Sequence, residues 1–243
     1  MKSLSIIIPC YNEGDKLLSN IDEVKKFIST FFIDNNLDYE IIVVNDGSKD
    51  NSEELLKKYC ENDDVCICVS YSKNKGKGFA VKEGIKASTK DIVLFMDADL
   101  STDLSAIVDV YSYIYDYNIV IGSRRHSQSI LVKKQNNIRR FIGKSCSILT
   151  NLITSFNISD TQCGFKAFDG DIARVLADKQ TINGFAFDVE LLYIAHLNGY
   201  SIKEIPVIWE NDEDSKVKVI DSSLRFFKDL LYIKSKTNQY KEK

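Results

Sequence analysis

The sequence has few of the residues that build structural metal sites or acyl-transfer triads. It has 243 residues but only two histidines, His126 and His196, and no cysteine pair with CxxC spacing. Structural zinc sites are built from clustered Cys and His ligands, so a zinc site is not expected. Neither histidine has a Ser or Cys triad context, and no serine has nucleophile-elbow spacing. Covalent acyl chemistry is therefore not expected either.

Long apolar runs, linkers and a large excess of one charge are also absent. No apolar stretch approaches the roughly 20 residues that a bilayer-spanning helix needs. The chain starts directly with a strand-like run, so no signal peptide is visible. The net charge of −3 argues against a dedicated nucleic-acid binder. The apolar surroundings of Cys66, Cys68 and Cys163 favour reduced, buried thiols, and we expect a cytoplasmic protein whose membrane contacts are peripheral.

The first 125 residues alternate between strand-like and helix-like segments. Strands are predicted at 4–8, 40–44, 65–69, 92–96 and 119–121, and helices at 15–32, 52–59, 78–87 and 103–115. Such alternation predicts an α/β fold, Rossmann-like, with a mostly parallel sheet covered by helices on both faces.

The pattern changes after residue 125. An amphipathic helix with a basic amino-terminal end is predicted at 138–156, and a second amphipathic helix at 220–234. Between them, strands are predicted at 164–168 and 202–205 and a helix at 187–198. With only two prolines and no repeat or linker, we expect one domain over 1–218 and a basic amphipathic extension over 219–243.

The most informative segment is 92–99, an apolar run that ends on two carboxylates. Asp97 and Asp99 are one residue apart, so on a continuing strand both side chains would point to the same side. Ligands of open α/β sheets bind at the carboxyl ends of the strands. Two carboxylates there favour Mg²⁺ or Mn²⁺ and, through the metal, a diphosphate. The alternative is a strand followed by an acidic turn.

Polar clusters follow the other predicted strands as well. Glu13 and Asp46 could hold a ribose hydroxyl or a base edge, and Arg124 with Arg125 could bind phosphate oxygens. Four such clusters at adjacent strand ends indicate one cleft. Taken singly, these residues have simpler explanations. Glu13 could be an acid at the amino-terminal end of a helix, and Asp46-Gly47 could be an ordinary turn pair.

The Gly76-Lys77-Gly78 segment is weak evidence for phosphate binding. It lacks the dinucleotide-binding fingerprint and no Walker-type Lys-Ser/Thr follows it. We interpret it as a tight turn that opens a helix, with Lys77 lining the cleft.

Together these clusters resemble the family 2 glycosyltransferases, which have a GT-A fold. The residues that carry the resemblance are Ser5–Glu13, Val43–Ser48, Asp97–Asp99 and Gly122–Arg124. Two further blocks, Asp160–Phe168 and Phe187–Ala195, resemble the polyprenyl-phosphate branch, and the dolichyl-phosphate β-glucosyltransferases are most alike.

The resemblance implies roles for particular residues. Pro9, Tyr11, Glu13 and Asp46 would bind the nucleoside. Asp97 and Asp99 would bind metal and diphosphate, with Asp99 the stronger candidate for direct metal contact. Arg124 would contact phosphate, Asp160 and Gln162 would lie near the reacting sugar, and Arg139 or Arg140 would meet the lipid phosphate. The Leu100–Leu104 loop lacks the proline that relatives often carry, so it supplies no clear third metal ligand.

The function that this resemblance implies is inverting transfer of a hexose, with glucose favoured, from a UDP-sugar to polyprenyl or dolichyl phosphate. A phosphate acceptor is already ionised at neutral pH and needs positioning more than a general base. The expected partners are the nucleotide sugar, the lipid phosphate, the cytoplasmic face of a membrane and possible membrane proteins. The alternative for the amphipathic helix at 138–156 is that it simply packs on the sheet.

Three other functions compete with this hypothesis. Transfer to a sugar hydroxyl would need a carboxylate base, for which Asp160 and Asp188 are candidates. A nucleotidyltransferase usually opens with a Gly-rich loop and a basic residue, which 4–13 lacks. A non-enzymatic scaffold is disfavoured by the intact Asp97, Asp99 and Arg124.

Overall fold

The computed structural model describes residues 1–32, 37–132, 137–210 and 219–241, with side chains left undescribed at 137–145 and 219–224. Its centre is a sheet of seven strands in the order β3-β2-β1-β4-β7-β5-β8. The bounds are β3 Cys66–Ser70, β2 Tyr39–Asn45, β1 Leu4–Cys10, β4 Ile92–Met96, β7 Phe165–Asp169, β5 Ile119–Ser123 and β8 Ile202–Pro206. A short parallel pair, β6 Ile130–Leu131 and β9 Ile208–Trp209, lies outside this sheet.

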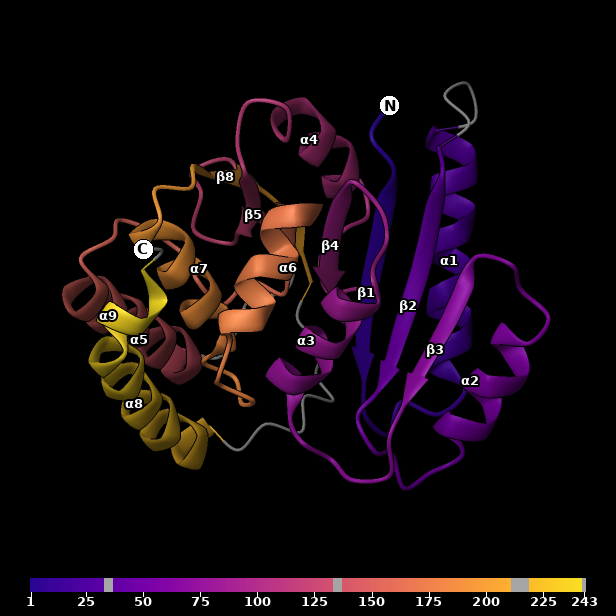
Figure 1. Cartoon of the computed structure of the whole chain (residues 1–243), viewed down its shortest axis with the longest axis horizontal. Coiled ribbons are helices and arrows are strands. Elements are labelled where there is room, and N and C mark those ends of the chain that lie inside the picture. The colour runs from indigo at the N-terminus through magenta and orange to yellow at the C-terminus, as the bar shows by residue number, and fades with distance from the viewer. Residues whose placement is uncertain (33–36, 133–136, 211–218, 242–243) are drawn as a thin grey trace.

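Helices cover both faces of the sheet, as the alternation predicted (Figure 1). One face packs against α1 Lys16–Phe31, α2 Ser52–Cys60 and α4 Ala106–Tyr113. The other packs against α3 Lys77–Ala87, α6 Gly170–Lys179, α7 Phe187–Leu197 and the carboxy-terminal α8 Val219–Ser235 and α9 Thr237–Tyr240. Strand residues alternate between the two cores: Ile6 and Ile8 face the first, and Ile7 faces the second.

One strand runs against the others. β7 is antiparallel to both of its neighbours and separates β4 from β5, with Met96 opposite Phe165. The clusters after β4 and β5 are therefore not on adjacent strands, which corrects the predicted arrangement. An antiparallel strand begins where its neighbours end. Consequently, the segment before Phe165 lies at the same edge as Asp97 and Arg124.

At this edge of the sheet, β1 stops pairing with β4 before it stops pairing with β2. β1 pairs with β2 as far as Cys10, but its pairing with β4 ends at Ile7. Pro9 has no backbone N–H and lies beyond the end of the β4 pairing, so the proline costs that ladder no hydrogen bond.

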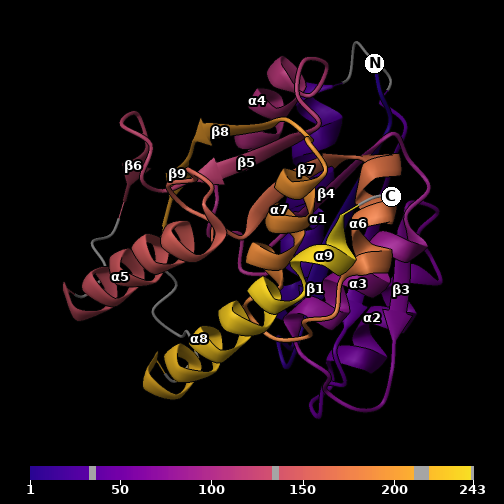
Figure 2. The same ribbon diagram turned by 60° about the vertical axis from the view of Figure 1, so that its left-hand side comes forward.

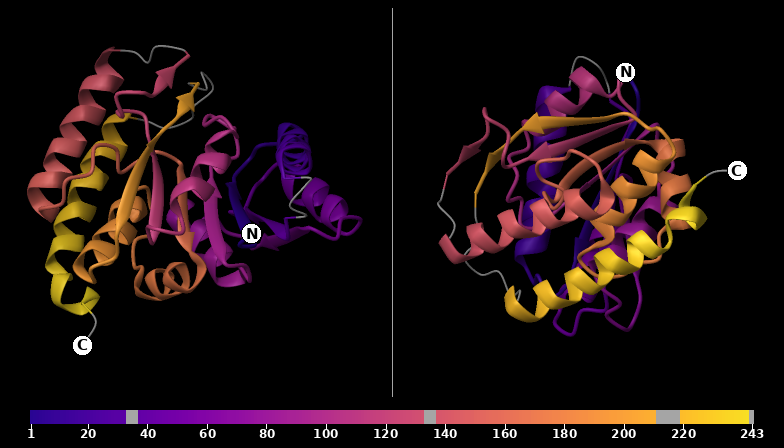
Figure 3. Two further views of the ribbon diagram at one scale, coloured as in Figure 1. Left: turned by 90° about the horizontal axis from the view of Figure 1, so that it is seen from above. Right: turned by 90° about the vertical axis from the view of Figure 1, so that its left-hand side faces the viewer.

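The amphipathic helix α5, Asn137–Thr154, contacts α8 rather than lying alone. Figures 2 and 3 show these two helices side by side, away from α1 and α2. Of the remaining elements, α6, α9, β6 and β9 were not predicted. The helix predicted at 103–115 is shorter at both ends, where residues 104–105 and 114–115 form turns.

α3 packs so closely on the sheet at Gly84 that there is no room for a side chain at this position. A side-chain carbon there would lie 3.1 Å from Val44 Cγ2 and closer still to Ile7 Cγ2. We expect Gly84→Val to destabilise the protein by about 1–3 kcal/mol through overpacking. Urea unfolding measures the change. Lys86→Val, a β-branched substitution at an exposed position of the same helix, should cost less than about 1 kcal/mol. Equal losses in the two variants would contradict this packing argument.

Candidate active site

The two aspartates of segment 92–99 lie in a turn and not on the strand. β4 ends at Met96, the amide of Leu100 donates to the Asp97 carbonyl at 3.3 Å, and Leu100 has a φ of +54°. The amide of Ser101 donates to Asp99 Oδ1 at 2.9 Å. This turn, and not the predicted strand alternation, brings the carboxylates close. A bulky residue in the left-handed region is strained, which is common at functional sites.

The backbone on the other side of Asp97 belongs to the β7 segment. The Asp97 amide donates to the Gly164 carbonyl at 3.1 Å. A side-chain carbon at Gly164 would overlap the Asp97 carboxylate. Glycine at 164 therefore allows Asp97 to occupy its position.

The ammonium group of Lys77 partly balances the charges of Asp97 and Asp99. Lys77, the first residue of α3, pairs with Asp97. Burial opposes its charge, but Asp97, Asp188 and Asp99 together raise the pKa of Lys77 above its usual value. Lys77 was predicted to line the cleft, and in the structure it pairs with the metal-ligand candidate Asp97.

Asp99 has less compensating positive charge nearby than Asp97, which pairs with Lys77. Burial and the neighbouring Asp97 raise the pKa of Asp99, against the opposing effects of Ser101 and Lys77. A divalent cation bound by both carboxylates would offset their repulsion, so Asp97 and Asp99 fit Mg²⁺ or Mn²⁺. Within the described residues there is no cluster of three or more Asp, Glu, His or Cys side chains suited to a metal. Two protein carboxylates suit a metal that also binds phosphate oxygens.

Beneath this pair lies a buried ion pair that the sequence analysis did not identify. Lys166 of β7 is fully buried, and its Nζ donates to Asp188 Oδ1 at 2.7 Å and to the Cys163 carbonyl at 2.5 Å. Burial raises the pKa of Asp188, although Lys166 and Lys77 counteract it. The signal was a lone lysine between apolar residues of a predicted strand, Phe165-Lys166-Ala167.

Arg124 and Asp160 form the second buried charge pair at the edge. Arg124 donates from Nε and Nη2 to the two Asp160 oxygens at 2.7 and 2.8 Å, and its own amide donates to Oδ2 at 3.0 Å. The Arg124 guanidinium also lies over the Trp209 ring, 5.4 Å from its centre. Asp160 is 1% exposed. Burial acts to raise the pKa of Asp160, but Arg124 outweighs it and lowers the pKa to about 2.

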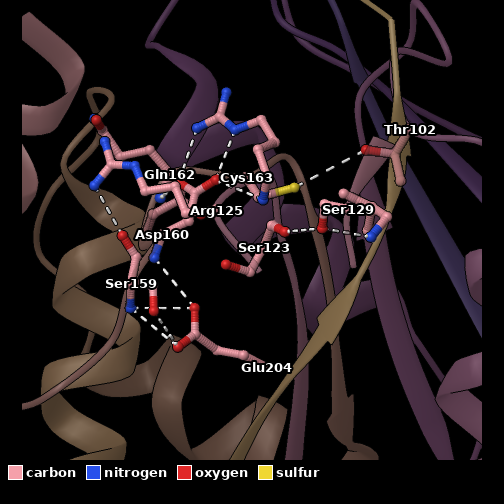
Figure 4. A network of polar contacts seen from close by, with 12 residues as sticks. Thr102, Ser123, Arg125, Ser129, Ser159, Asp160, Gln162, Cys163 and Glu204 are labelled. Carbon is pink, nitrogen blue, oxygen red and sulfur yellow. Dashed lines mark hydrogen bonds and ion pairs between the residues drawn. The ribbon is translucent and has the colours of Figure 1, made fainter. Parts of the chain in front are cut away.

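The backbone of the Asp160 segment is held by Glu204 of the edge strand β8 (Figure 4). The Glu204 carboxylate accepts from the Ser159 amide and hydroxyl and from the Asp160 amide, at 3.0–3.2 Å. Arg125 donates to the Ser159 carbonyl at 2.9 Å, so it also supports this turn. The half-buried Gln162 follows, with its amide 3.3 Å from Asp160 Oδ1. Glu204 was not predicted, because only the folded chain brings β8 to this segment.

Asp46 anchors a loop at the nucleoside end. Its carboxylate accepts from the Tyr71 hydroxyl at 2.9 Å and from the amides of Lys75 and Gly76 at 2.7 and 2.9 Å. Burial and Asp46 raise the pKa of Tyr71. Asp46 therefore holds the start of α3, in addition to any role toward a nucleoside.

The remaining predicted residues lie around the same edge. Pro9, Tyr11 and Glu13 are partly exposed at the end of β1. The loop after β1 is pinned to that after β2, since the Asn12 amide donates to Ser48 Oγ at 2.9 Å. The side chains of Arg139 and Arg140 lie outside the described part of the structure. The binding roles of all these residues stay predictions.

The Glycosyl transferase family 2 sequence model matches residues 5–176. The chain belongs to this family. It is 36% identical over 240 residues to a protein of Dictyostelium discoideum named dolichyl-phosphate beta-glucosyltransferase, covering 95% of this chain and 73% of that one. A protein of the same name from Homo sapiens is 34% identical over 243 residues, covering 96% and 75%.

Solved structures share the fold. Glucosyl-3-phosphoglycerate synthase from Mycobacterium tuberculosis in complex with UDP superposes with a TM-score of 0.69 at 17% identity, covering 96% of this chain and 80% of that one. The same enzyme with Mn²⁺, UDP-glucose and phosphoglyceric acid gives a TM-score of 0.66, with the same coverage. This family 2 chain thus has the predicted GT-A fold, with a carboxy-terminal helix, and is a hexosyltransferase.

Loss of the Asp160 charge should reduce stability strongly. Asp160→Asn leaves the Arg124 guanidinium without its buried partner, and we expect a loss of about 3–5 kcal/mol in the free energy of unfolding. The folded-state pKa lies below the ordinary value of 3.8, so the charge of Asp160 stabilises the protein above pH 4. About 2 kcal/mol of this stabilisation should disappear as the pH falls from 4 to 2, and the variant should lack that change.

Urea unfolding between pH 2 and 7 measures both effects. Asp171→Asn is the matched control, because the Asp171–Arg174 pair is exposed and should contribute less than about 1 kcal/mol. An Asp160→Asn protein with the acid dependence of the wild type would show that Asp160 is not the titrating group.

Proposed function

We propose that this glycosyltransferase transfers glucose from UDP-glucose to dolichyl or a related polyprenyl phosphate, with inversion at the anomeric carbon. The relatives named dolichyl-phosphate beta-glucosyltransferase favour this donor and acceptor. The observation that carries the proposal is the state of the candidate base: both oxygens of the Asp160 carboxylate accept hydrogen bonds from Arg124, which lowers the pKa of the carboxyl group and keeps it ionised.

That commitment suits a phosphate acceptor. A phosphate oxygen of the lipid would form the new bond to C1 of glucose, while the bond from C1 to the UDP oxygen breaks and UDP leaves with its electron pair. The acceptor carries its negative charge before the reaction, so no proton has to be removed. Asp188, the other candidate base, is 4% exposed and paired with Lys166. The sugar-hydroxyl alternative is therefore the weaker hypothesis.

Residues of the cleft would have distinct tasks in this reaction. Asp97 and Asp99 would hold Mg²⁺ or Mn²⁺, which would stabilise the charge of the departing diphosphate as a Lewis acid. Lys77 would orient Asp97 and add positive charge beside the diphosphate. Arg124 would face phosphate through Nη1, since Nε and Nη2 are bound to Asp160. Pro9, Tyr11 and Glu13 would contact the nucleoside, Gln162 the sugar, and Arg139 or Arg140 the lipid phosphate.

Incubation of purified protein with radiolabelled UDP-glucose, dolichyl phosphate and Mn²⁺ tests the reaction. We expect an organic-extractable glucosyl lipid, and much less product from GDP-mannose. Asp99→Asn should lower turnover roughly 100-fold or more, because it removes a ligand of the charge-stabilising metal. Asp103→Asn, an exposed acid four residues later, should retain wild-type turnover. Absence of glucolipid, together with transfer to a sugar hydroxyl, would favour the alternative acceptor.

We also propose peripheral binding to the cytoplasmic face of a membrane. Among the described residues no helix is long and apolar enough to cross a bilayer. The surface of α5 and α8 nevertheless exposes large apolar side chains, which we call the apolar helix face: Ile148, Leu152, Phe227, Leu231 and Tyr232. Exposed Arg225 and Lys228 lie next to it in sequence, as expected for contact with anionic headgroups. In this proposal, 1–218 is the catalytic domain and 219–243 the membrane-directed extension.

Vesicle sedimentation tests the membrane contact. Replacing Leu152, which is 74% exposed, by Glu should weaken binding to anionic vesicles about tenfold, because it removes buried apolar area and adds repulsive charge. Phe31→Glu, at a 60% exposed position on α1, introduces the same charge elsewhere and should leave binding unchanged. If the two variants bind like the wild type, the apolar helix face does not contact the membrane.

A further inference from the structure

Tyr240, near the carboxyl end of the chain, is held in the protein interior from both its backbone and its side chain. It is 2% exposed. Its hydroxyl donates to Glu190 Oε1 at 2.5 Å, and its carbonyl accepts from Lys179 Nζ at 3.1 Å and Asn198 Nδ2 at 2.9 Å. These contacts join α9 to α6 and α7. Tyr240 is therefore part of the folded core.

Glu190 also binds the segment between α6 and α7 and so links it to Tyr240. The side chain is fully buried on α7. Besides Tyr240, its carboxylate accepts from the Thr181 amide at 3.0 Å, the Thr181 hydroxyl at 2.5 Å and the Ile182 amide at 2.7 Å. A buried carboxylate needs such donors, and each one that is lost is costly. Glu190 therefore couples the position of Tyr240 to that of residues 181–182.

The next residue, Asn183, caps the helix that carries Lys77. The carbonyl of Asn183 accepts from the amides of Gly78 and Phe79 at 2.8 and 3.3 Å. The N-cap residue of α3 is Gly76, which has no side chain to serve these amides, so the carbonyl substitutes for a capping side chain. Gly76 has a φ of +105°, and a side-chain carbon there would lie 2.5 Å from the Asn183 oxygen. The contact is thus close and specific to glycine.

Gln180 makes a second connection between the same segments. Its Nε2 donates to the Gly78 carbonyl at 2.8 Å and to the Ile182 carbonyl at 2.8 Å. The start of α3 is consequently held on both its amide and its carbonyl side by residues 180–183.

We propose that Tyr240 is a positioning residue for the sugar-nucleotide site, acting through Glu190 and residues 181–183 on the first turn of α3. Lys77 is the first residue of that helix and pairs with Asp97. A small shift of this turn would move the ammonium group away from Asp97, which would bind the metal of the diphosphate in the proposed reaction. The inference rests on the proposed function for the identity of the ligand, UDP-glucose, but not for the connection itself.

The test compares two tyrosine hydroxyls that both link α7 to the carboxy-terminal segment. Tyr240→Phe removes the hydrogen bond to Glu190 and a 3.4 Å contact with the Thr181 hydroxyl. The matched control is Tyr193→Phe, which removes a 2.9 Å contact with Thr237 of α9 and a 3.3 Å contact with Lys234 Nζ of α8, neither of which involves residues 180–183. Calorimetry measures the Kd of UDP-glucose with Mn²⁺, thermal unfolding measures stability, and hydrogen exchange measures protection of the Gly78 and Phe79 amides.

Both variants should lower the melting temperature by a few degrees, because each substitution removes a hydroxyl with two polar contacts. Only Tyr240→Phe should raise the Kd, roughly three- to tenfold, and speed exchange at Gly78 and Phe79. In a Lys77→Met background, Tyr240→Phe should have no further effect on the Kd, because the two changes act through one contact.

Equal changes of Kd in Tyr240→Phe and Tyr193→Phe, or none in either, would overturn the proposal. If the wild type binds no UDP-glucose, the proposed function fails, while the exchange rates of Gly78 and Phe79 still decide whether Tyr240 positions α3. If Tyr240→Phe does not fold, Thr181→Val removes a hydroxyl donor from the same carboxylate and should produce the same pattern of Kd and exchange.

Discussion

The antiparallel pairing of β7 with β4 is the constraint on which the site depends. It places the amino-terminal end of β7 beside the carboxyl end of β4, so that the Gly164 carbonyl accepts from the Asp97 amide at 3.1 Å. Without that reversal, the segment before β7 would lie at the opposite edge of the sheet. Asp160 then pairs with Arg124 from the end of β5, and Lys166 reaches Asp188 beneath Asp97. Residues from both halves of the chain are thereby brought to one edge.

Charge balance explains how so many acids can share that edge. Lys77 serves Asp97, Lys166 serves Asp188 and Arg124 serves Asp160, each at a buried or partly buried position. Asp99 has the least compensation, and burial with the nearby Asp97 raises its pKa. Such an uncompensated carboxylate beside a second one suits a divalent cation and an anionic ligand. Asp160, by contrast, is paired with Arg124, which lowers the pKa of its carboxyl group.

The carboxy-terminal helices have two surfaces with different consequences. Phe226, Leu230 and Ile233 of α8 and Tyr240 of α9 are buried in the same core as β1 and α3. The opposite side of α8, together with α5, forms the apolar helix face. The carboxy-terminal segment therefore combines an exposed apolar surface with an inner surface that is buried in the core beside the sheet.

The sequence by itself determined the alternating elements and the polar residues at the strand ends. Apolar periodicity and local turn residues are encoded over a few positions, so β4 at Ile92–Met96 was predicted to the residue. Only the tertiary structure decided the direction of β7 and the partners of Asp160. It also decided the roles of Glu204, Lys166 and Glu190. These contacts join residues separated by 22 to 50 positions, and one sequence carries no signal of such pairings. Even the proximity of Asp97 and Asp99, predicted from strand alternation, arises from a turn stabilised by its surroundings.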